Sequence, residues 1–185
     1  VTLNVLGTGA WASGGNTNHQ DSERGGSAGT QTAGLIFGGG TPPAPIQATT
    51  EQYNGSTWTE VSALNTGRQA LKGSVNSPYT SAIGFGGASS TTNPSGSNLN
   101  ESWNGTSWTE IAELNTAAKN AGGCGTTTDA LKISGQTAPG SALGNVEKWN
   151  GASWTEIAEV NSNRLEIMAT GGSTSAIATG GSFID

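Results

Sequence analysis

Apolar residues in this chain occur in short runs, and small or turn-forming residues interrupt each run. The runs that begin at Leu35 and Ile83 read Leu-Ile-Phe-Gly-Gly and Ile-Gly-Phe-Gly-Gly, and those at Leu131 and Ile177 read Leu-Lys-Ile-Ser-Gly and Ile-Ala-Thr-Gly-Gly. Runs bounded by Gly, Asn-Gly and Ser/Thr are typical of β-strands. Few residues are arranged at helical spacing, so the pattern predicts an all-β protein.

The strand pattern repeats along the chain. Each clear copy has a glutamate, an aromatic residue two positions later, an Asn-Gly pair and then a tryptophan. These tryptophans, Trp58, Trp108 and Trp154, stand 50 and 46 residues apart. A degraded copy ends at Trp11, which is 47 residues before Trp58, and carries Leu6 where the others carry an aromatic residue. Four-stranded units repeated at this period are typical of propeller blades.

Each period resolves into four predicted strands. The first is a run of small residues, such as the one that begins at Gly122, and the second is the apolar run. The third alternates toward the first aromatic residue, and the fourth begins at the tryptophan. The Asn-Gly pair between them predicts a tight hairpin in which both residues take positive φ. Asn54 and Asn104 also fit the glycosylation pattern, but Asn150 keeps the Asn-Gly and loses the hydroxyl, which favours the turn.

The point at which the repeat begins and stops at each end of the sequence predicts how the strands are grouped into blades. Three whole blades cover about 24–64, 68–114 and 119–160. Residues 1–14 supply two strands and residues 165–185 supply the other two, so the two ends together complete a fourth blade within a single domain, 1–185. Such closure leaves no open sheet edge. An open array and a ring shared between chains are the alternatives.

These motifs resemble the kelch-type repeat, in which an apolar run ending in Gly-Gly is followed by a spaced aromatic pair and then a basic residue. Arg68 and Arg164 each follow their tryptophan by ten residues. The aromatic pair is closer together here than is usual for the family, and the first copy lacks its first aromatic residue. The resemblance implies a kelch-like β-propeller, and the repeats also look like those of bacteriophage tail-fibre proteins. The matching glycines are Gly38, Gly39, Gly86, Gly87, Gly180 and Gly181.

Charge and cysteine content exclude several partners. Seven Lys and Arg face thirteen Asp and Glu, for a net charge of −6, and no basic cluster suggests nucleic-acid binding. No apolar stretch approaches the roughly 20 residues of a membrane span, so no membrane insertion is expected. The single cysteine, Cys124, lies among glycines and is interpreted as a buried small residue.

The sequence gives little support for catalysis, and we expect neither a metal nor a cofactor. The one histidine, His19, lies in a polar stretch, and no metal-ligand cluster is present. Acids recur in every repeat and are therefore expected on solvated strand faces or paired with Arg68, Lys119 and Arg164. A glycosidase would instead need two acids in one cleft. The recurring acids are Glu51, Glu60, Glu101, Glu110, Glu147 and Glu156.

The aromatic residues divide into two predicted roles. Trp11, Trp58, Trp108 and Trp154 are expected to fill the space between neighbouring sheets. Trp103 and Trp149 vary in kind between copies, so we expect them to be partly exposed and, with Tyr53, to be candidate ligand contacts. The loops between the second and third strands of each unit are polar and differ from one another, as recognition loops often do. Candidate contacts there are Thr41, Gln47, Ser89, Asn93 and Gln136.

The function predicted from these features is that of a non-enzymatic structural or binding propeller. It would act in a virion, such as a phage tail fibre, or in another extracellular appendage. Its partners would be neighbouring virion or surface proteins, further copies of the chain, or a host surface glycan. The alternatives are a secreted or cell-surface lectin that binds sugars on tryptophan platforms and, more remotely, a glycan hydrolase.

Overall fold

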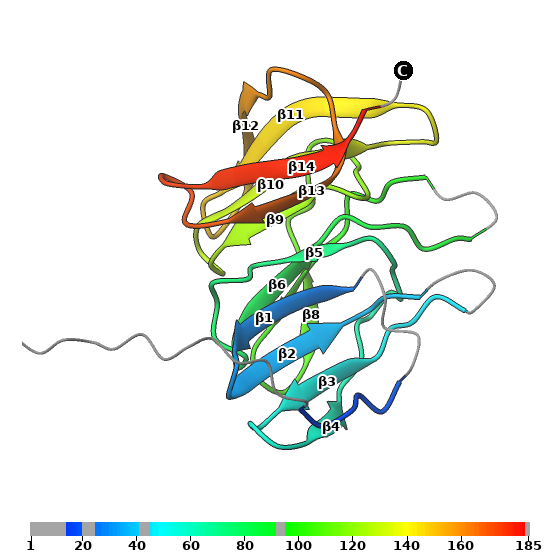
Figure 1. Ribbon diagram of the computed structural model, residues 1–185, viewed down its shortest axis with the longest axis vertical. Coiled ribbons are helices and arrows are strands. Elements are labelled where there is room, and N and C mark those ends of the chain that lie inside the picture. Colours follow the sequence, from blue (N-terminus) through cyan, green and yellow to red (C-terminus); the bar gives the residue numbers. More distant parts are fainter. Residues whose placement is uncertain (1–13, 20–24, 41–44, 92–94, 184–185) are drawn as a thin grey trace, which may run out of the picture.

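The computed structural model describes residues 14–19, 25–40, 45–91 and 95–183 (Figure 1). All regular structure in these ranges is β-strand, so the predicted all-β class is confirmed. None of these residues belongs to a helix that could cross a bilayer. Trp11, Thr41 and Asn93, and the two strands predicted within 1–14, lie outside the described residues.

Three four-stranded antiparallel sheets follow one another along the chain, each with its strands in sequence order. Sheet one contains β1 (Gly26–Thr30), β2 (Ala33–Phe37), β3 (Thr50–Tyr53) and β4 (Trp58–Val61). Sheet two contains β5 (Lys72–Gly73), β6 (Ala82–Phe85), β7 (Asn100–Trp103) and β8 (Trp108–Ile111). Sheet three contains β9 (Gly122–Gly125), β10 (Ala130–Gln136), β11 (Ala142–Trp149) and β12 (Trp154–Glu159).

A fourth, two-stranded sheet follows near the C-terminal end of the chain. It pairs β13 (Leu165–Thr170) with β14 (Ile177–Ser182) in antiparallel register. By repeat position these strands correspond to the first and second strands of the other sheets. The strands of the three larger sheets fall within the ranges expected for whole blades.

The first strands of successive sheets lie side by side, because β1 contacts β5, β5 contacts β9 and β9 contacts β13. Their small residues make this approach possible. A Cβ on Gly73 would lie 2.5 Å from the Ser27 carbonyl oxygen, and one on Gly123 would lie 2.6 Å from the Lys72 Cβ. A cavity of about 170 Å³ is lined by residues of all four of these strands, among them Ser27, Lys72, Gly123 and Ile167.

The apolar core lies between neighbouring sheets. Phe37 of β2 packs on Trp108 of the next sheet with ring centroids 4.7 Å apart, and Phe85 of β6 packs on Trp154 at 5.0 Å. Each contact joins the second strand of one sheet to the fourth strand of the following sheet. This inter-sheet packing explains why the phenylalanine and the tryptophan recur at the repeat period.

The Asn-Gly hairpins differ from the prediction. Only the glycine takes positive φ, +93° at Gly55 for example, whereas the asparagine does not. The loop has four residues, since Tyr53 pairs with Trp58, and the Asn54 side-chain oxygen accepts hydrogen bonds from the backbone N–H groups of Ser56 and Thr57, both at 2.9 Å. The same two bonds form at Asn150, where the donors are Ala152 and Ser153. The asparagine therefore acts through its side chain rather than through a left-handed backbone.

Candidate functional site

The connections between second and third strands lie along one side of the molecule, on the right in Figure 1. These are the β2–β3, β6–β7 and β10–β11 connections. The β6–β7 and β10–β11 connections are joined directly, because Gly96 donates to the Thr137 carbonyl at 2.6 Å. The β2–β3 connection is bonded to the chain that leads into sheet two, because Arg68 donates to the Gln47 carbonyl at 3.2 Å. Backbone hydrogen bonds between neighbouring sheets therefore support the connections on this side of the molecule.

The predicted loop contacts occupy different environments. Ser89 is exposed, Gln47 is half-buried, and Gln136 is buried at 8% exposure with its main chain paired to Lys119. Pro139 and Gly140 at the tip of the β10–β11 connection are exposed. Loop side chains that reach solvent thus come from at least two sheets.

The prediction that Trp103 and Trp149 are partly exposed is wrong. Their exposed fractions are 1% and 2%. The Trp103 indole N–H donates to the Tyr79 carbonyl, and the Trp149 indole donates to the Thr127 carbonyl. Each ring also packs against the tryptophan of the following strand. Because they are enclosed, neither ring offers a face on which a sugar could stack.

Sheet one presents the corresponding aromatic pair differently. Tyr53 and Trp58 are both half-buried, and their ring centroids lie 4.9 Å apart. Tyr53 lines two cavities of about 390 and 580 Å³, the first shared with Tyr79 and the second with Trp58. Among the candidate aromatic contacts described, Tyr53 is the one that solvent reaches.

The recurring acids divide into two sets, and the prediction of solvated faces holds for only one of them. Glu60, Glu110 and Glu156 are exposed. The acids of the third strands are buried at 0–1% exposure, because each third strand lies between the second and fourth strands of its sheet and the connection that leads into the sheet covers the acid. These buried acids are Glu51, Glu101 and Glu147.

Each buried glutamate accepts hydrogen bonds from an asparagine in that incoming connection. Glu101 accepts from the Asn65 backbone N–H at 2.8 Å and from its side-chain amide at 3.0 Å, and the same amide donates to the Trp108 carbonyl. Glu51 with Asn18, and Glu147 with Asn115, repeat all three bonds. These Glu–Asn contacts join each sheet to the chain that enters it, so the acids are structural.

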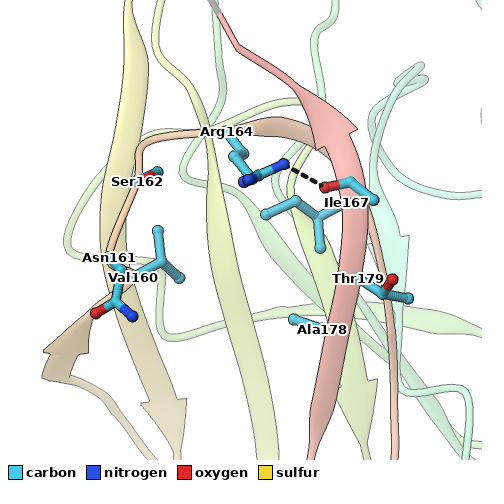
Figure 2. Close-up of a pocket in the computed structure, with 8 residues that line it drawn as sticks. Val160, Asn161, Ser162, Arg164, Ile167, Ala178 and Thr179 are labelled. Atoms are coloured by element: carbon cyan, nitrogen blue, oxygen red, sulfur yellow. Dashed lines mark hydrogen bonds between the residues drawn. The ribbon is translucent and has the colours of Figure 1, made fainter.

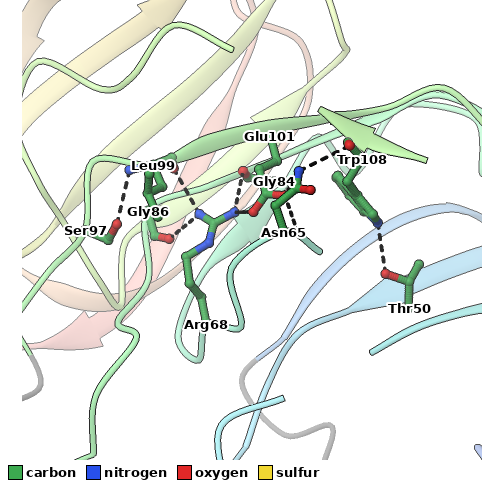
Figure 3. A network of polar contacts seen from close by, with 9 residues as sticks. All are labelled: Thr50, Asn65, Arg68, Gly84, Gly86, Ser97, Leu99, Glu101 and Trp108. Atoms are coloured by element: carbon green, nitrogen blue, oxygen red, sulfur yellow. Dashed lines mark hydrogen bonds and ion pairs between the residues drawn. The ribbon is translucent and has the colours of Figure 1, made fainter. Parts of the chain in front are cut away.

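Arg68 completes the contact in sheet two (Figure 3). Its guanidinium forms a fully buried ion pair with Glu101 at 2.9 Å and donates to the carbonyl oxygens of Gly84, Gly86 and Leu99. Burial lowers the pKa of Arg68, while the charge of Glu101 opposes that shift.

In sheet three an ion pair with the buried acid comes from a position that the repeat does not predict. Lys132 of β10 pairs with Glu147, at 3.6 Å. Burial lowers the pKa of Lys132, and Glu147 opposes the shift. Lys119 is buried nearby, and its backbone pairs with Gln136. The β10 lysine reaches the acid from the neighbouring strand, so both Glu101 and Glu147 have a buried cationic partner.

Arg164 lies in a groove beside β14 (Figure 2). The groove has a volume of about 290 Å³ and runs between the chain that follows β12 and the two-stranded sheet; its lining includes Val160, Asn161, Arg164, Ile167, Thr179 and Gly180. Arg164 donates to the Gly180 carbonyl at 3.2 Å, and its guanidinium lies 3.9 Å from the centre of the Phe183 ring. No acid of the described residues forms an ion pair with it at 4 Å or less.

Groups with catalytic potential are sparse in the described ranges. No cluster of three His, Cys, Asp or Glu side chains there could hold a metal ion. His19 lies 2.9 Å from Glu60 at the surface. Cys124 is buried, and its burial raises the thiol pKa, which disfavours the reactive thiolate.

No protein-family model matches this chain, and no curated protein matches its sequence.

Proposed function

We propose that this chain is a non-enzymatic binding module built as a kelch-like propeller of four sheets. It presents its second-to-third-strand loops to a neighbouring protein or to a host surface glycan. A virion, for instance a phage tail fibre, or another extracellular appendage is the setting in which such a module fits.

The propeller part of the proposal rests on the order of the sheets. The first strands of successive sheets lie side by side, and a cavity is lined by all four of them. Asn18 meets Glu51 and the Trp58 carbonyl as Asn65 and Asn115 meet their own partners, so the chain enters sheet one as it enters sheets two and three. A fourth sheet placed before sheet one accounts for both features.

The binding part of the proposal rests on one observation: the repeated residues that could carry chemistry are used in contacts between sheets. Glu101 and Glu147 hold incoming connections, and Trp103 and Trp149 are enclosed. The connections that lack the repeat lie together on one side and expose residues such as Ser89 and Pro139. Variable loops on a rigid scaffold are the usual place for recognition.

Glycan and surface binding would test the loop proposal. The purified chain is applied to an array of bacterial surface polysaccharides, and Kd is measured for each positive ligand. We expect Ser89→Trp or Pro139→Trp to weaken binding at least 10-fold. Thr109→Trp and Thr155→Trp, at exposed positions on β8 and β12, are the matched controls and should leave Kd unchanged. Equal effects of loop and control variants would contradict the proposal, as would turnover of a bound glycan.

Sugar binding at Tyr53 is the second candidate, because this ring is half-exposed beside two cavities lined by polar side chains. Aromatic faces combined with amide and hydroxyl groups suit sugar rings. Loss of glycan binding in Tyr53→Ala with retained binding in Ser89→Trp would select the lectin. The reverse pattern would select the loops. Detection of the chain in purified virions would test the setting separately.

A further inference from the structure

We propose that Lys132 and Asn145 react with each other in the folded chain and form an amide crosslink between their side chains. The new bond joins the Lys132 Nζ of β10 to the Asn145 Cγ of β11, and one ammonia is released. Glu147 is the group that moves the protons. The inference concerns the interior of sheet three and does not depend on the proposed function.

The three side chains meet inside sheet three. Lys132 stands directly opposite Glu147 in the pairing of β10 with β11, and Asn145 precedes Glu147 by two residues, on the same face of β11. The exposed fraction is 0% for Lys132 and Glu147 and 8% for Asn145. The strand pairing therefore brings an amine, an amide and a carboxyl group together where water is nearly excluded.

The amine lies against the amide with which it reacts. The Lys132 Nζ is 2.7 Å from the Asn145 Oδ1, the oxygen attached to the carbon at which the new bond forms. The same Nζ lies 3.5 Å from the Asn145 main-chain carbonyl oxygen, so two contacts hold it beside this residue. Because the reacting groups are held in contact on neighbouring strands, the step is unimolecular and its barrier is much lower than between free molecules.

One oxygen of Glu147 faces both ends of the reaction. Its Oε1 lies 3.6 Å from the Lys132 Nζ and accepts a hydrogen bond from the Asn145 Nδ2 at 3.2 Å. The Nζ is the nucleophile and the Nδ2 is the leaving nitrogen, so this oxygen is placed to take a proton from the first and give one to the second. Glu156 of β12 contacts the same Nδ2 through its Oε2, at 3.4 Å.

The surroundings of Lys132 favour the neutral amine that the reaction needs. Burial lowers the pKa of Lys132, although the charges of Glu147 and Glu156 oppose that shift. Transfer of a proton from the Nζ to the Glu147 carboxylate converts two buried charges into two neutral groups, and a nonpolar interior favours the neutral forms. The lone pair of the amine is then available for attack.

The atoms and protons balance without a further reactant. The neutral Nζ attacks the Asn145 Cγ, and an electron pair of the C=O bond moves to the Oδ1. When that pair returns, the bond between the Cγ and the Nδ2 breaks, and the protonated Glu147 gives its proton to the Nδ2. Glu147 then takes the surplus proton from the Nζ and passes it to the departing ammonia, which leaves as ammonium. The carboxylate is restored, and the Nζ keeps one hydrogen as an amide.

The fold itself does not require this lysine and asparagine. Sheets one and two form the same four-stranded arrangement with other residues at both positions. The buried acid recurs in all three sheets, so the lysine and the asparagine together distinguish sheet three. The residues in their places are Ile36 and Thr49 in sheet one and Gly84 and Leu99 in sheet two.

The crosslink closes residues 132–145 into a covalent ring. This ring contains the exposed tip of the β10–β11 connection at Pro139 and Gly140, so a cut in the tip leaves the chain in one piece. Like a disulfide, the ring also restricts the unfolded chain and thereby favours the folded state. The β10–β11 hairpin is then the one that resists proteolysis and unfolding most strongly.

Mass spectrometry of the purified full chain tests the proposal. After incubation at neutral pH, the denatured protein should weigh less than its sequence by one ammonia. Trypsin should no longer separate the chain after Lys132, and residues 120–148 should appear as one peptide that carries the whole loss. Fragmentation of this peptide should place the bond between Lys132 and Asn145.

Three variants separate the chemistry from the structural role of these residues. Lys132→Arg keeps the charge and the trypsin site but lacks the amine, so the loss of ammonia should disappear. Glu147→Gln should slow the reaction about 100-fold. Lys148→Arg, at the half-buried neighbour that pairs with Asp129, is the matched control and should react at the wild-type rate. Near-ultraviolet circular dichroism establishes that each variant is folded.

Several results overturn the proposal. A wild-type chain with the full mass of its sequence does so whether or not any variant folds. Loss of ammonia from a peptide that contains an Asn-Gly pair indicates a succinimide at that turn instead. Loss confined to residues 133–148, with cleavage after Lys132, indicates a succinimide at Asn145; hydroxylamine cleaves the chain at a succinimide and leaves an amide crosslink intact. Reaction of folded Glu147→Gln at the wild-type rate contradicts the role of Glu147.

Discussion

Sheet two and the two-stranded sheet carry an arginine at the same repeat position, in contrasting surroundings. Arg68 is fully buried, paired with Glu101 and bonded to three carbonyl groups. Arg164 is half-buried, bonds to Gly180 and lies over Phe183. Glu101 of β7 and the Leu99 carbonyl just before β7 accept hydrogen bonds from Arg68, whereas among the described residues only β13 pairs with β14. Repeat position alone therefore does not fix the environment of a side chain.

The aromatic residues show the same contrast. Trp108 and Trp154 pack on phenylalanines of the preceding sheets, Phe37 and Phe85. In β14 the residue at the phenylalanine position is Thr179. In the proposed ring Trp58 is the tryptophan that would face it, and Trp58 is half-buried. The phenylalanine–tryptophan contact between sheets thus forms where both residues of the repeat are present. At β14, where threonine replaces the phenylalanine, the repeat does not supply it.

Glu101→Ala should produce the largest loss of stability. It leaves the Arg68 charge buried without its partner, which costs about 3–5 kcal/mol. Arg164→Ala removes bonds to carbonyl groups without leaving a buried charge, and should cost only about 1–2 kcal/mol. Urea unfolding at pH 7 measures both. Glu110→Ala, at an exposed position, is the control and should stay within about 0.5 kcal/mol of the wild type. Equal losses for the two main variants would remove the contrast between the sheets.

Trp108→Ala should rank next. Truncation of a tryptophan that is 5% exposed and packed on Phe37 leaves a cavity and costs about 3–4 kcal/mol. Trp58→Ala removes a half-buried ring and should cost about half as much. Urea titration measures the free energy of unfolding of each variant, and the two losses relative to the wild type are then compared. A larger loss at Trp58 would show that sheet one is covered as fully as sheet two.

Thr179→Phe should stabilise the chain. It restores the residue found at this position in sheets one and two and gives Trp58 a ring to pack on, worth about 0.5–1.5 kcal/mol if the fourth sheet precedes sheet one. The double variant Thr179→Phe with Trp58→Ala isolates the pair, because the gain must disappear with the tryptophan. A gain that persists in the double variant would contradict packing between these two sheets.

The smallest expected effect on the free energy of unfolding is the one that low pH exerts through Asp129. Asp129 in the β9–β10 turn accepts a hydrogen bond from Ser173 in the β13–β14 turn, and that bond, followed by Lys148, lowers the pKa of the carboxyl below its ordinary value of 3.8. The folded state therefore favours the ionised form. Its contribution to stability is complete above about pH 5 and is lost as the pH falls through the lowered pKa.

Asp129→Asn checks this assignment. The free energy of unfolding of the variant should fall less between pH 5 and pH 2 than that of the wild type. Because the carboxyl is well exposed, the difference is small, and a steeper fall in the variant would contradict the assignment.

Several features of the fold follow directly from the sequence. The period of the tryptophans located the fourth strands, and the glycine doublets located the ends of β2 and β6. In contrast, β10 continues through Ser134-Gly135 and β14 continues through Gly180-Gly181. Asn-Gly located the hairpins, but the expected left-handed asparagine was wrong. Since a side-chain oxygen can bond the turn N–H groups, the same dipeptide supports a four-residue loop with the asparagine in an ordinary conformation.

The candidate site was predicted less well, for a physical reason that particular residues make clear. Trp103 was expected near solvent because its type varies between copies, yet variation among large aromatic residues is compatible with an enclosed position. Glu101 and Glu110 looked equivalent as recurring acids, and they lie opposite each other on β7 and β8. The connection that carries Asn65 covers Glu101 inside the sheet, whereas Glu110 lies on the outer strand and is exposed. The signal that could have separated them is the asparagine that recurs before each unit at Asn65 and Asn115.

The sequence by itself determined the strand composition, the repeat unit and the positions of the turns, because these depend on local spacing and on residues near in the chain. The tertiary structure decided which repeated residues are buried. That depends on which strand of a neighbouring sheet lies against each side chain, so Arg68 and Arg164 share a repeat position but not an environment. For the same reason, a cation at a position that the repeat does not mark, Lys132 of β10, forms the buried ion pair with Glu147.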